Sequence, residues 1–594
     1  MKENVSSDSL PKVIFFITGF FLFLLPLIPD EKITRWKLWV LESGLFIILI
    51  TWIFNKINSE RIYIKNSELN KPILIWLIFS IFLYIISSNL HIAELELYRV
   101  IICFLSFFVF SNIILKNGRK EILIRFWLIG GFLSVIYGLM THYGGFWIIT
   151  TPKVDRIFST FGNPIFFASF LVVSFPFIIY KITLSSNFLN RFFWFIISLA
   201  FLIALFFTKS RAGWVGLGVS SLVLIFNLLK TKKQKIFFII VFSIITAGFI
   251  YKTKNVWTRQ QAHLLIWRDS LKMVSRNPLL GVGLGTFHIN FPNYASEELK
   301  KIWPQMQNIV NDAHSEFVQI LAETGIIGFG IFLWIIIIYF LQLNKFKKNI
   351  NDKNKILLQN VGLASVCGIL VQNLFSVDMR FTISSFYLFT VIGITSSLPD
   401  NYEVNININK NQKYFFAVIL IAGIIFLEYN MVVKQYRSWN LVFRSKDFLN
   451  TKILNSDDQK KIVQKMIDSN PGDAQLYFKL GYLWANEIKT NKEAIQKAIE
   501  YFSKAADINP AIENGGAYNN LGNIYFTIGN RAMAKENYIR AINVNPKLID
   551  AHLNLGIAYY YDGKLKESVA EFEKVLQLEP KNLQAVYMLK KMRE

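Results

Sequence analysis

Long apolar runs recur along the first 430 residues, and they restrict what this chain can fold into. A helix needs about 20 apolar residues to cross the hydrocarbon core of a bilayer. We predict thirteen such spans, at 13–29, 36–54, 72–87, 97–115, 122–140, 165–180, 192–207, 212–229, 236–251, 326–342, 356–375, 381–396 and 414–430. Because backbone groups in lipid must be hydrogen-bonded within their own segment, residues 1–430 are predicted to form an all-α, polytopic membrane domain.

Composition agrees with this class of protein. The chain is 53% hydrophobic and 16% aromatic, and its net charge of +24 is typical of a membrane protein with lysine-rich cytoplasmic loops rather than of a nucleic-acid-binding protein. Cys103 and Cys367 lie inside apolar runs, which favours a packing role over a disulfide. The six histidines are scattered, so we expect no metal site and no cofactor. The first apolar run lacks a small-residue cleavage site, so we expect no cleavable signal peptide.

Basic residues predict the orientation of the chain. With the N-terminus inside, the inside segments carry 22 lysines and arginines, and the short outside loops carry 7. This asymmetry predicts that the N-terminus is cytoplasmic. An odd number of spans then places the loop 252–325 and the C-terminal part on the outer side. A loop of that length is uncommon unless it is functional.

The loop 252–325 contains two segments with helical features. Trp267, Leu271 and Val274 have helical spacing before Asn277-Pro278, which predicts a short amphipathic helix along the membrane surface. The later segment NDAHSEFVQILAETGIIGFGIFLW, residues 311–334, begins polar and continues as an apolar run. We expect one continuous helix there, capped by Asn311 or Asp312, with His314 and Gly325 on one face.

A repeat replaces the apolar runs after residue 430. Residues 515–548 and 549–582 share a pattern of 34 residues, and a looser copy occupies about 474–510. This period is that of the tetratricopeptide repeat. We therefore predict an α-solenoid over 431–594, closed by a capping helix at 583–594 and able to bind a protein partner.

Unusual polar residues collect on the predicted outer face. They are Arg156 before Phe161-Gly162-Asn163-Pro164, Arg211 in the turn TKSRAGWVGLG, and Arg259, Arg268, Arg276 and His314 in the long loop. A single arginine at a span end is typical of a membrane anchor, and a single histidine of packing. Arg211 differs because small neighbours leave room for a ligand. The glycines of GVGLG lack the other elements of a phosphate loop, so nucleotide binding is not expected.

Several guanidiniums and one histidine at a membrane surface suit one type of substrate, a diphosphate that links a sugar chain to an isoprenoid lipid. Arginine binds phosphate oxygens in a bidentate manner and keeps its charge at low dielectric. Such arginines can neutralise the leaving diphosphate, and a histidine can take the proton of an attacking hydroxyl. This pattern predicts glycosyl transfer without nucleotide or metal.

Four motifs carry a family resemblance: His314-Ser315 followed by Gly325 and Gly328; Ser210 to Gly213; Pro278 to Gly283; and Arg156 with Phe161 to Pro164. On these motifs, residues 13–400, with a core at about 190–400, resemble the O-antigen ligase and O-antigen polymerase family of bacterial membrane glycosyltransferases. That family includes protein O-oligosaccharyltransferases. It often has an arginine about four residues before the loop tryptophan, where this chain has His263.

The resemblance implies an undecaprenyl-diphosphate-linked glycan as donor and a lipid or a protein as acceptor, in the assembly of lipopolysaccharide or another surface glycan. It implies His314 and Arg211 as catalytic residues and Arg156, Arg259, Arg268 and Arg276 as candidates to bind the donor diphosphate. Supporting roles would fall to Asn163, Ser315, Glu323, Gly325 and Gly328. The activity could be that of a ligase, a polymerase or a protein transferase. Two other functions stay open as alternatives, a flippase of lipid-linked glycans and a membrane-anchored scaffold.

Overall fold

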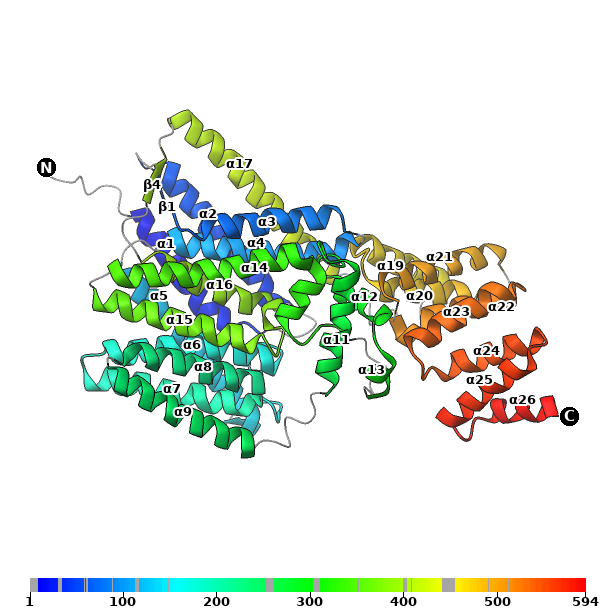
Figure 1. Cartoon of the computed structure of the whole chain (residues 1–594). Coiled ribbons are helices and arrows are strands. Elements are labelled where there is room, and N and C mark those ends of the chain that lie inside the picture. Colours follow the sequence, from blue (N-terminus) through cyan, green and yellow to red (C-terminus); the bar gives the residue numbers. More distant parts are fainter. Residues whose placement is uncertain are drawn as a thin grey trace.

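The computed structural model shows a bundle of long helices followed by a helical solenoid (Figure 1). It describes residues 9–29, 35–57, 59, 62–87, 89–112, 117–146, 149–229, 231–252, 261–302, 310–349, 352–398, 403–406, 409–440, 455–489, 491–510 and 512–593.

Each of the thirteen predicted spans overlaps one helix of the bundle. These helices are α1 (Ser9–Leu24), α2 (Trp36–Ile57), α3 (Asn70–Ile85), α4 (Leu90–Asn112), α5 (Asn117–Tyr143), α6 (Pro164–Leu184), α7 (Phe188–Thr208), α8 (Arg211–Leu228), α9 (Lys232–Lys252), α14 (Glu316–Asn349), α15 (Lys353–Gln372), α16 (Thr382–Ser396) and α17 (Lys410–Glu428). Within the described residues, eight helices are long and apolar enough to cross a membrane, and three shorter apolar helices accompany them. The predicted fold class is confirmed, and the number of crossings stays a prediction.

Burial divides the bundle into central and peripheral helices. All residues of α16 from Ile383 to Ser396 are buried, so this helix is central. Its Tyr387 ring stacks on that of Trp127, with centroids 5.2 Å apart. By contrast, α7 and α17 expose large apolar side chains such as Phe188 and Phe415. An apolar surface of this kind suits contact with lipid chains.

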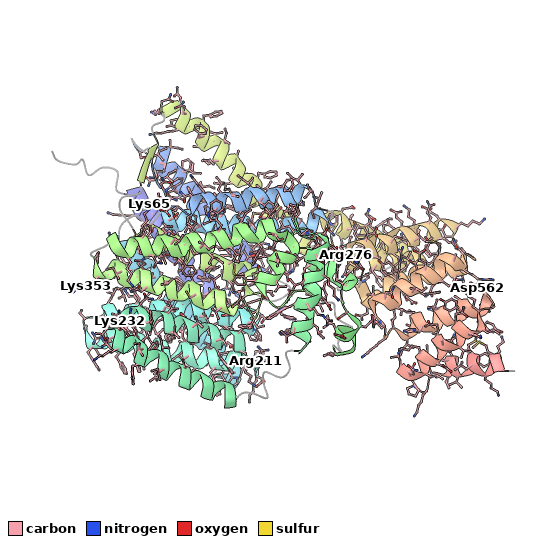
Figure 2. The ribbon with its side chains drawn as sticks, viewed as in Figure 1. Lys65, Arg211, Lys232, Arg276, Lys353 and Asp562 are labelled. Carbon is pink, nitrogen blue, oxygen red and sulfur yellow. The ribbon has the colours of Figure 1, made fainter. Side chains whose placement is uncertain are left out.

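The two ends of the bundle differ in the segments that they carry. Lys65, Lys232 and Lys353, from three segments predicted to be inside, lie at one end (Figure 2). There β1 (Ile62–Lys65) pairs antiparallel with β4 (Glu403–Ile406). A second short pair joins β2 (Gly145–Phe146) and β3 (Ile149–Thr150). The opposite end, called the loop end below, carries Arg211 and Arg276 (Figure 2).

Short helices cover part of the loop end and run across the direction of the bundle helices (Figure 1). They are α11 (Gln261–Arg276), α12 (Phe287–Asn290), the 3-10 turn η3 (Phe291–Asn293) and α13 (Glu297–Ile302). Ile266, Met273 and Phe287 are fully buried in a small core between them. The predicted amphipathic helix is confirmed as α11, which ends directly before Asn277; its place on a membrane surface stays a prediction.

The expected continuous helix through His314 and Gly325 is wrong. Helix α14 begins at Glu316, so His314 precedes it, and the backbone of His314 is left-handed with φ +51°. Gly325 has φ +65° and ψ −168°, which interrupts the helix. The two residues therefore do not share one face of a helix, and the Asp312 side chain caps the turn at His314 instead of the helix start.

The solenoid extends from the loop end (Figure 1). Its helices are α19 (Ser456–Ser469), α20 (Ala474–Ala485), α21 (Lys492–Ile508), α22 (Gly516–Thr527), α23 (Arg531–Val544), α24 (Ile549–Tyr561), α25 (Leu565–Leu578) and α26 (Leu583–Arg593), with a 3-10 turn η6 (Ile512–Gly515). A glycine on the first helix of each pair lets an aromatic ring of the second approach. At Gly522, an added Cβ would lie 2.4 Å from the ring of Tyr538. This contact explains the glycine and aromatic positions of the repeat.

Candidate functional site

A cavity of about 620 Å³ opens at the loop end, within the size range of small-molecule sites. Six separate segments form it: the loop at Arg156, the start of α6, the α7–α8 turn, α11, the loop directly before Glu316 and the loop that carries Asp378. Its polar lining consists of Arg156, Asn163, Lys209, Ser210, Arg211, His263, Asp312, His314, Ser376 and Asp378. We call this space the first cavity.

His314 is held by Asp312 in two ways. The amide of His314 donates to Oδ1 of Asp312 at 2.9 Å, which forms a local side-chain turn that accommodates the left-handed backbone. Nδ1 of the ring lies 3.2 Å from the same oxygen. A carboxylate at Nδ1 places the ring proton there and leaves Nε2 able to accept a proton.

His263 covers one face of the His314 ring. The two imidazoles are nearly parallel, with centroids 4.4 Å apart and planes 15° apart. Burial, followed by the nearby His314 and Arg211, lowers the pKa of His263 to about 4. His263 is therefore neutral at pH 7, so it adds no positive charge. Beside it on α11, Trp267 Nε1 donates to the Ala313 carbonyl at 2.8 Å, which ties this helix to the His314 turn.

Arg211 is the first residue of α8 and lines the first cavity. Ser210 caps the helix by accepting from the Gly213 amide at 3.2 Å, and Lys209 before it is left-handed, with φ +52°. Asn163 caps α6 in the same way, accepting from the Ile165 amide at 2.8 Å. Two helix N-termini thus face one cavity, and the partial positive charge of each favours an anion.

Two further cations lie at the margin of the first cavity. Nε of Arg156 donates to the Thr208 carbonyl at 3.0 Å, which fixes this guanidinium beside the α7–α8 turn. Lys209 is paired with Asp155, with Nζ 2.6 Å from Oδ1. Because Asp155 balances Lys209, the arginines are the stronger candidates to hold an anionic ligand.

Asp378 contributes a buried carboxyl to the same wall. Ser376 donates to its Oδ2 at 2.9 Å, and its Oδ1 has no hydrogen-bond partner within the part of the chain that the structure describes. Burial raises the pKa of Asp378 to about 8. At pH 7 this group is mostly protonated, so it can donate a hydrogen bond to a ligand.

A buried ion cluster lies next to the first cavity and consists of Glu96, Arg99, Glu316, Glu323 and Arg380. Arg380 Nη2 lies 2.5 Å from Glu323 Oε2, and Nη1 lies 3.2 Å from Glu96 Oε2. Arg99 pairs with Glu96, and its Nη2 lies 3.9 Å from Glu316 Oε1. The cluster joins α4, α14 and the turn before α16, and so holds the start of α14 in place behind His314.

Gly325 explains how two sequence motifs meet. The amides of Ile326 and Ile327 donate to the carbonyls of Pro278 and Leu279, at 2.8 and 3.4 Å. A Cβ on Gly325 would lie 2.3 Å from the Leu279 carbonyl oxygen, and one on Gly281 would lie 2.3 Å from the Glu323 carbonyl carbon. Both glycines also have positive φ. The segment from Pro278 to Gly283 is therefore inserted against the broken helix α14.

The other supporting residues lie close to this junction. Glu323 accepts from the amides of Gly285 and Phe287, at 3.0 and 3.2 Å. Ser315 is buried directly before α14. A Cβ on Gly328 would meet the ring of Phe79 on α3 at 2.9 Å, so this glycine allows two helices to approach.

Two predicted donor-binding arginines are not in the first cavity. Arg268 is exposed and binds Glu298 and Ser296, at 2.7 and 2.8 Å, where it links α11 to α13. Arg276 lies over the ring of Tyr294, 5.3 Å from its centroid. Both point away because α11 presents His263 and Trp267 to the cavity instead. The third predicted arginine, Arg259, lies outside the described residues.

Sequence reasoning named Glu323 but missed Asp378 and the other four members of the ion cluster. Glu96 and Arg99 had a usable signal, because paired charges three residues apart in an apolar helix are rare without a function. Arg380 and Asp378 occur in a short turn between two predicted spans, where no sequence signal marked them. The partnership of Asp312 with His314 depends on a left-handed backbone that no pattern indicated. Among the described residues, no group of three or more potential ligands is placed to hold a metal ion.

Comparison with known families identifies two regions of the chain. Residues 196–333 match the family model described as O-antigen ligase. The protein contains an O-antigen ligase domain. The matched stretch supplies Arg211, His263 and His314, whereas Arg156 and Asp378 lie outside it. Residues 515–548 and 549–582 match tetratricopeptide-repeat models, so both parts of the predicted resemblance are confirmed.

The curated relatives that this chain matches are similar to only part of it, and the chain spans less than a quarter of the length of either. A TPR repeat-containing protein of Methanocaldococcus jannaschii is 31% identical over 137 residues, which is 23% of this chain and 21% of that protein. A UDP-N-acetylglucosamine–peptide N-acetylglucosaminyltransferase of Giardia intestinalis is 30% identical over 19% of this chain and 7% of its own length.

The solved structures that are similar to this chain also cover only part of it. The crystal structure of MamA is 24% identical, covers 23% of this chain and 80% of its own, and has a TM-score of 0.21. The first tetratricopeptide domain of human RPAP3 is 27% identical, covers 21% of this chain and 92% of its own, and has a TM-score of 0.19.

Proposed function

We propose that this protein transfers a glycan from an undecaprenyl-diphosphate-linked donor to an acceptor hydroxyl at the outer face of the bacterial cytoplasmic membrane. The observation that carries the proposal is the convergence of Arg211, Arg156 and the Asp312–His314 pair on the first cavity. The match of residues 196–333 to the O-antigen ligase model also supports a transferase of this class.

The donor diphosphate would bind where the cations and helix N-termini meet. Arg211 and Arg156 offer guanidinium donors, and the capped starts of α6 and α8 add favourable partial charges. As the bond between the anomeric carbon and the phosphate oxygen breaks, its electron pair leaves with the diphosphate. Both arginines then stabilise the developing charge, and this requires no metal.

The acceptor would be activated by His314. Nε2 removes the proton of the acceptor hydroxyl while that oxygen attacks the anomeric carbon, forming the new glycosidic bond. Asp312 stabilises the imidazolium that results, as its contact with Nδ1 allows. Asp378, protonated at pH 7, is placed to donate a hydrogen bond within the same cavity.

The solenoid favours a polypeptide among the possible partners. Helical repeats offer an extended concave surface, which we propose recruits a protein acceptor or an assembly partner. A pulldown with full-length protein, compared with protein truncated after residue 440, tests this role. Capture of the same partners by both forms would contradict it.

The proposed activity can be tested by reconstitution. The purified protein is placed in liposomes with a synthetic undecaprenyl-diphosphate oligosaccharide and either lipid A core, a second lipid-linked glycan or a serine-containing protein. We expect glycan transfer to one acceptor by wild type, and loss in His314→Ala and Arg211→Ala but not in the matched surface variant Arg268→Ala. Movement of the donor between leaflets without transfer would instead indicate a flippase.

A further inference from the structure

A second cavity, of about 330 Å³, lies on the other side of the turn that carries Asp378. Phe375 to Asp378 line the first cavity, and Arg380 to Ile383 line the second. The remaining lining comes from Arg35 directly before α2, from α2 and α4, from Gly285 and from the segment that follows α17. Its polar and aromatic residues include Trp39, Glu42, Glu96, Arg99, Arg380 and Gln435. The two cavities therefore share one short wall.

The charges of the second cavity do not suit a phosphate. Three arginines line it, Arg35, Arg99 and Arg380. Arg99 and Arg380 are paired within the ion cluster, which holds three carboxylates against two guanidiniums, so the excess carboxylate balances the charge of Arg35. No net positive charge remains there for an anion. The first cavity, by contrast, has two arginines and two helix N-termini. A diphosphate therefore belongs to the first cavity, and a neutral ligand is the better occupant of the second.

Glu42 indicates which hydrogen-bonding groups that ligand carries. The side chain lines the second cavity, and the residue is 2% exposed. Its Oε2 has no hydrogen-bond partner among the residues that the structure describes. A buried carboxyl oxygen without a hydrogen-bond partner is costly, and the hydroxyl or amide groups of a ligand would satisfy it.

Aromatic rings line the approach to the same space. Trp39 borders the cavity, and its ring centroid lies 5.3 Å from those of both Trp36 and Tyr436. Trp36 is 41% exposed, so the group reaches the protein surface. The C–H faces of a pyranose ring stack on indole, while its hydroxyls bind carboxylates. Aromatic rings with a few convergent polar groups are typical of a small-ligand site.

We propose that the second cavity binds neutral pyranose residues of a glycan. This inference rests on the proposed function and deepens it: the first cavity holds the diphosphate, and the second holds sugar residues of the donor or of the acceptor. Met431 and Gln435 in its lining belong to the segment that leads to the solenoid, so the bound glycan contacts the junction of the two parts of the chain.

Direct binding tests the proposal without relying on transfer. Glycan released by mild acid from the lipid-linked donor of the native host is titrated into the full-length protein by calorimetry. We expect saturable binding that Glu42→Gln and Trp39→Phe weaken at least tenfold. Glu68→Gln is the control, since Glu68 pairs with Lys345 at 2.7 Å and does not line the cavity, and this variant should bind as wild type does.

Competition separates the two sources of the glycan. If the sugars of the donor occupy the second cavity, saturation with undecaprenyl-diphosphate oligosaccharide abolishes binding of the free glycan; if those of the acceptor do, binding persists. Failure of wild type to bind, or equal binding by all variants at unchanged melting temperature, overturns the proposal. Binding in the absence of any transfer would overturn the proposed function and leave the glycan site standing.

Discussion

The imidazole rings of His263 and His314 stack with their centroids 4.4 Å apart, and Asp312 contacts Nδ1 of His314 from the side. One ring therefore holds the orientation of the other without adding charge, because His263 is neutral at pH 7. The stack lies at the position on α11 where the resemblance to the ligase family leads us to expect an arginine.

This stack predicts different results for two replacements of His263. His263→Phe keeps a flat ring against His314, so we expect transfer within a few-fold of wild type. His263→Ala removes the ring and lets His314 rotate, and we expect kcat to fall about tenfold or more. Steady-state rates of glycan transfer distinguish the two. A His263→Phe variant as inactive as His263→Ala would show that a ring nitrogen, and not the stack, is required.

Asp312 is predicted to act through its charge as well as its shape. Asp312→Asn keeps an oxygen that can accept from the His314 amide, so the turn should survive. The loss of negative charge leaves the imidazolium without its stabilising partner, and we expect kcat to fall roughly 10²- to 10⁴-fold with little change in KM. Steady-state rates measured at increasing donor concentration give kcat and KM separately and so check this prediction. An unchanged kcat would contradict the assigned role.

The raised pKa of Asp378 predicts that the protein loses affinity for the donor at alkaline pH. Its raised pKa of about 8 means that it is protonated in the neutral range and becomes negative above that value. The new charge would repel the diphosphate, so KM for the donor should rise above pH 8. The same raised pKa means that folding stability falls as pH increases from about 4 to about 8, because only the folded state keeps the proton.

Asp378→Asn should flatten both dependences, because it mimics the protonated group. Donor KM and melting temperature, measured from pH 6 to pH 9 in wild type and variant, provide the check. Parallel curves for the two proteins would assign the pH dependence to another group.

Gly325 and its contact with the segment from Pro278 to Gly283 predict a cost in stability for any side chain. Gly325→Ala forces a left-handed residue and a clash with the Leu279 carbonyl, and we expect a loss of about 1–3 kcal/mol. Gly330→Ala is the matched control, because nothing lies within 4 Å of its added Cβ. Thermal unfolding in detergent compares them. Equal melting temperatures would contradict the importance of this junction.

The sequence predicted those features that depend on local pattern. Apolar runs located the bundle helices, the 34-residue period located the repeats, and motifs identified Arg211, His314 and Arg156, which the fold brings to one cavity. Prediction from the sequence failed where contacts between distant segments determine the structure. The turn segment from Pro278 to Gly283 packs against α14 where that helix is broken at Gly325, and α11 turns Arg268 and Arg276 outward. Such contacts between distant segments leave no periodic signal in a single sequence.

The separate roles of Arg211 in donor binding and of His314 in acceptor activation are tested most directly by measuring donor binding and transfer independently. Undecaprenyl-diphosphate oligosaccharide binding and single-turnover transfer are compared in wild type, Arg211→Ala and His314→Ala. We predict that Arg211→Ala loses both donor affinity and transfer. His314→Ala should bind the donor as wild type does and transfer roughly 10²- to 10⁴-fold more slowly. Donor binding that is unchanged in Arg211→Ala, or transfer that is unchanged in His314→Ala, would contradict this assignment.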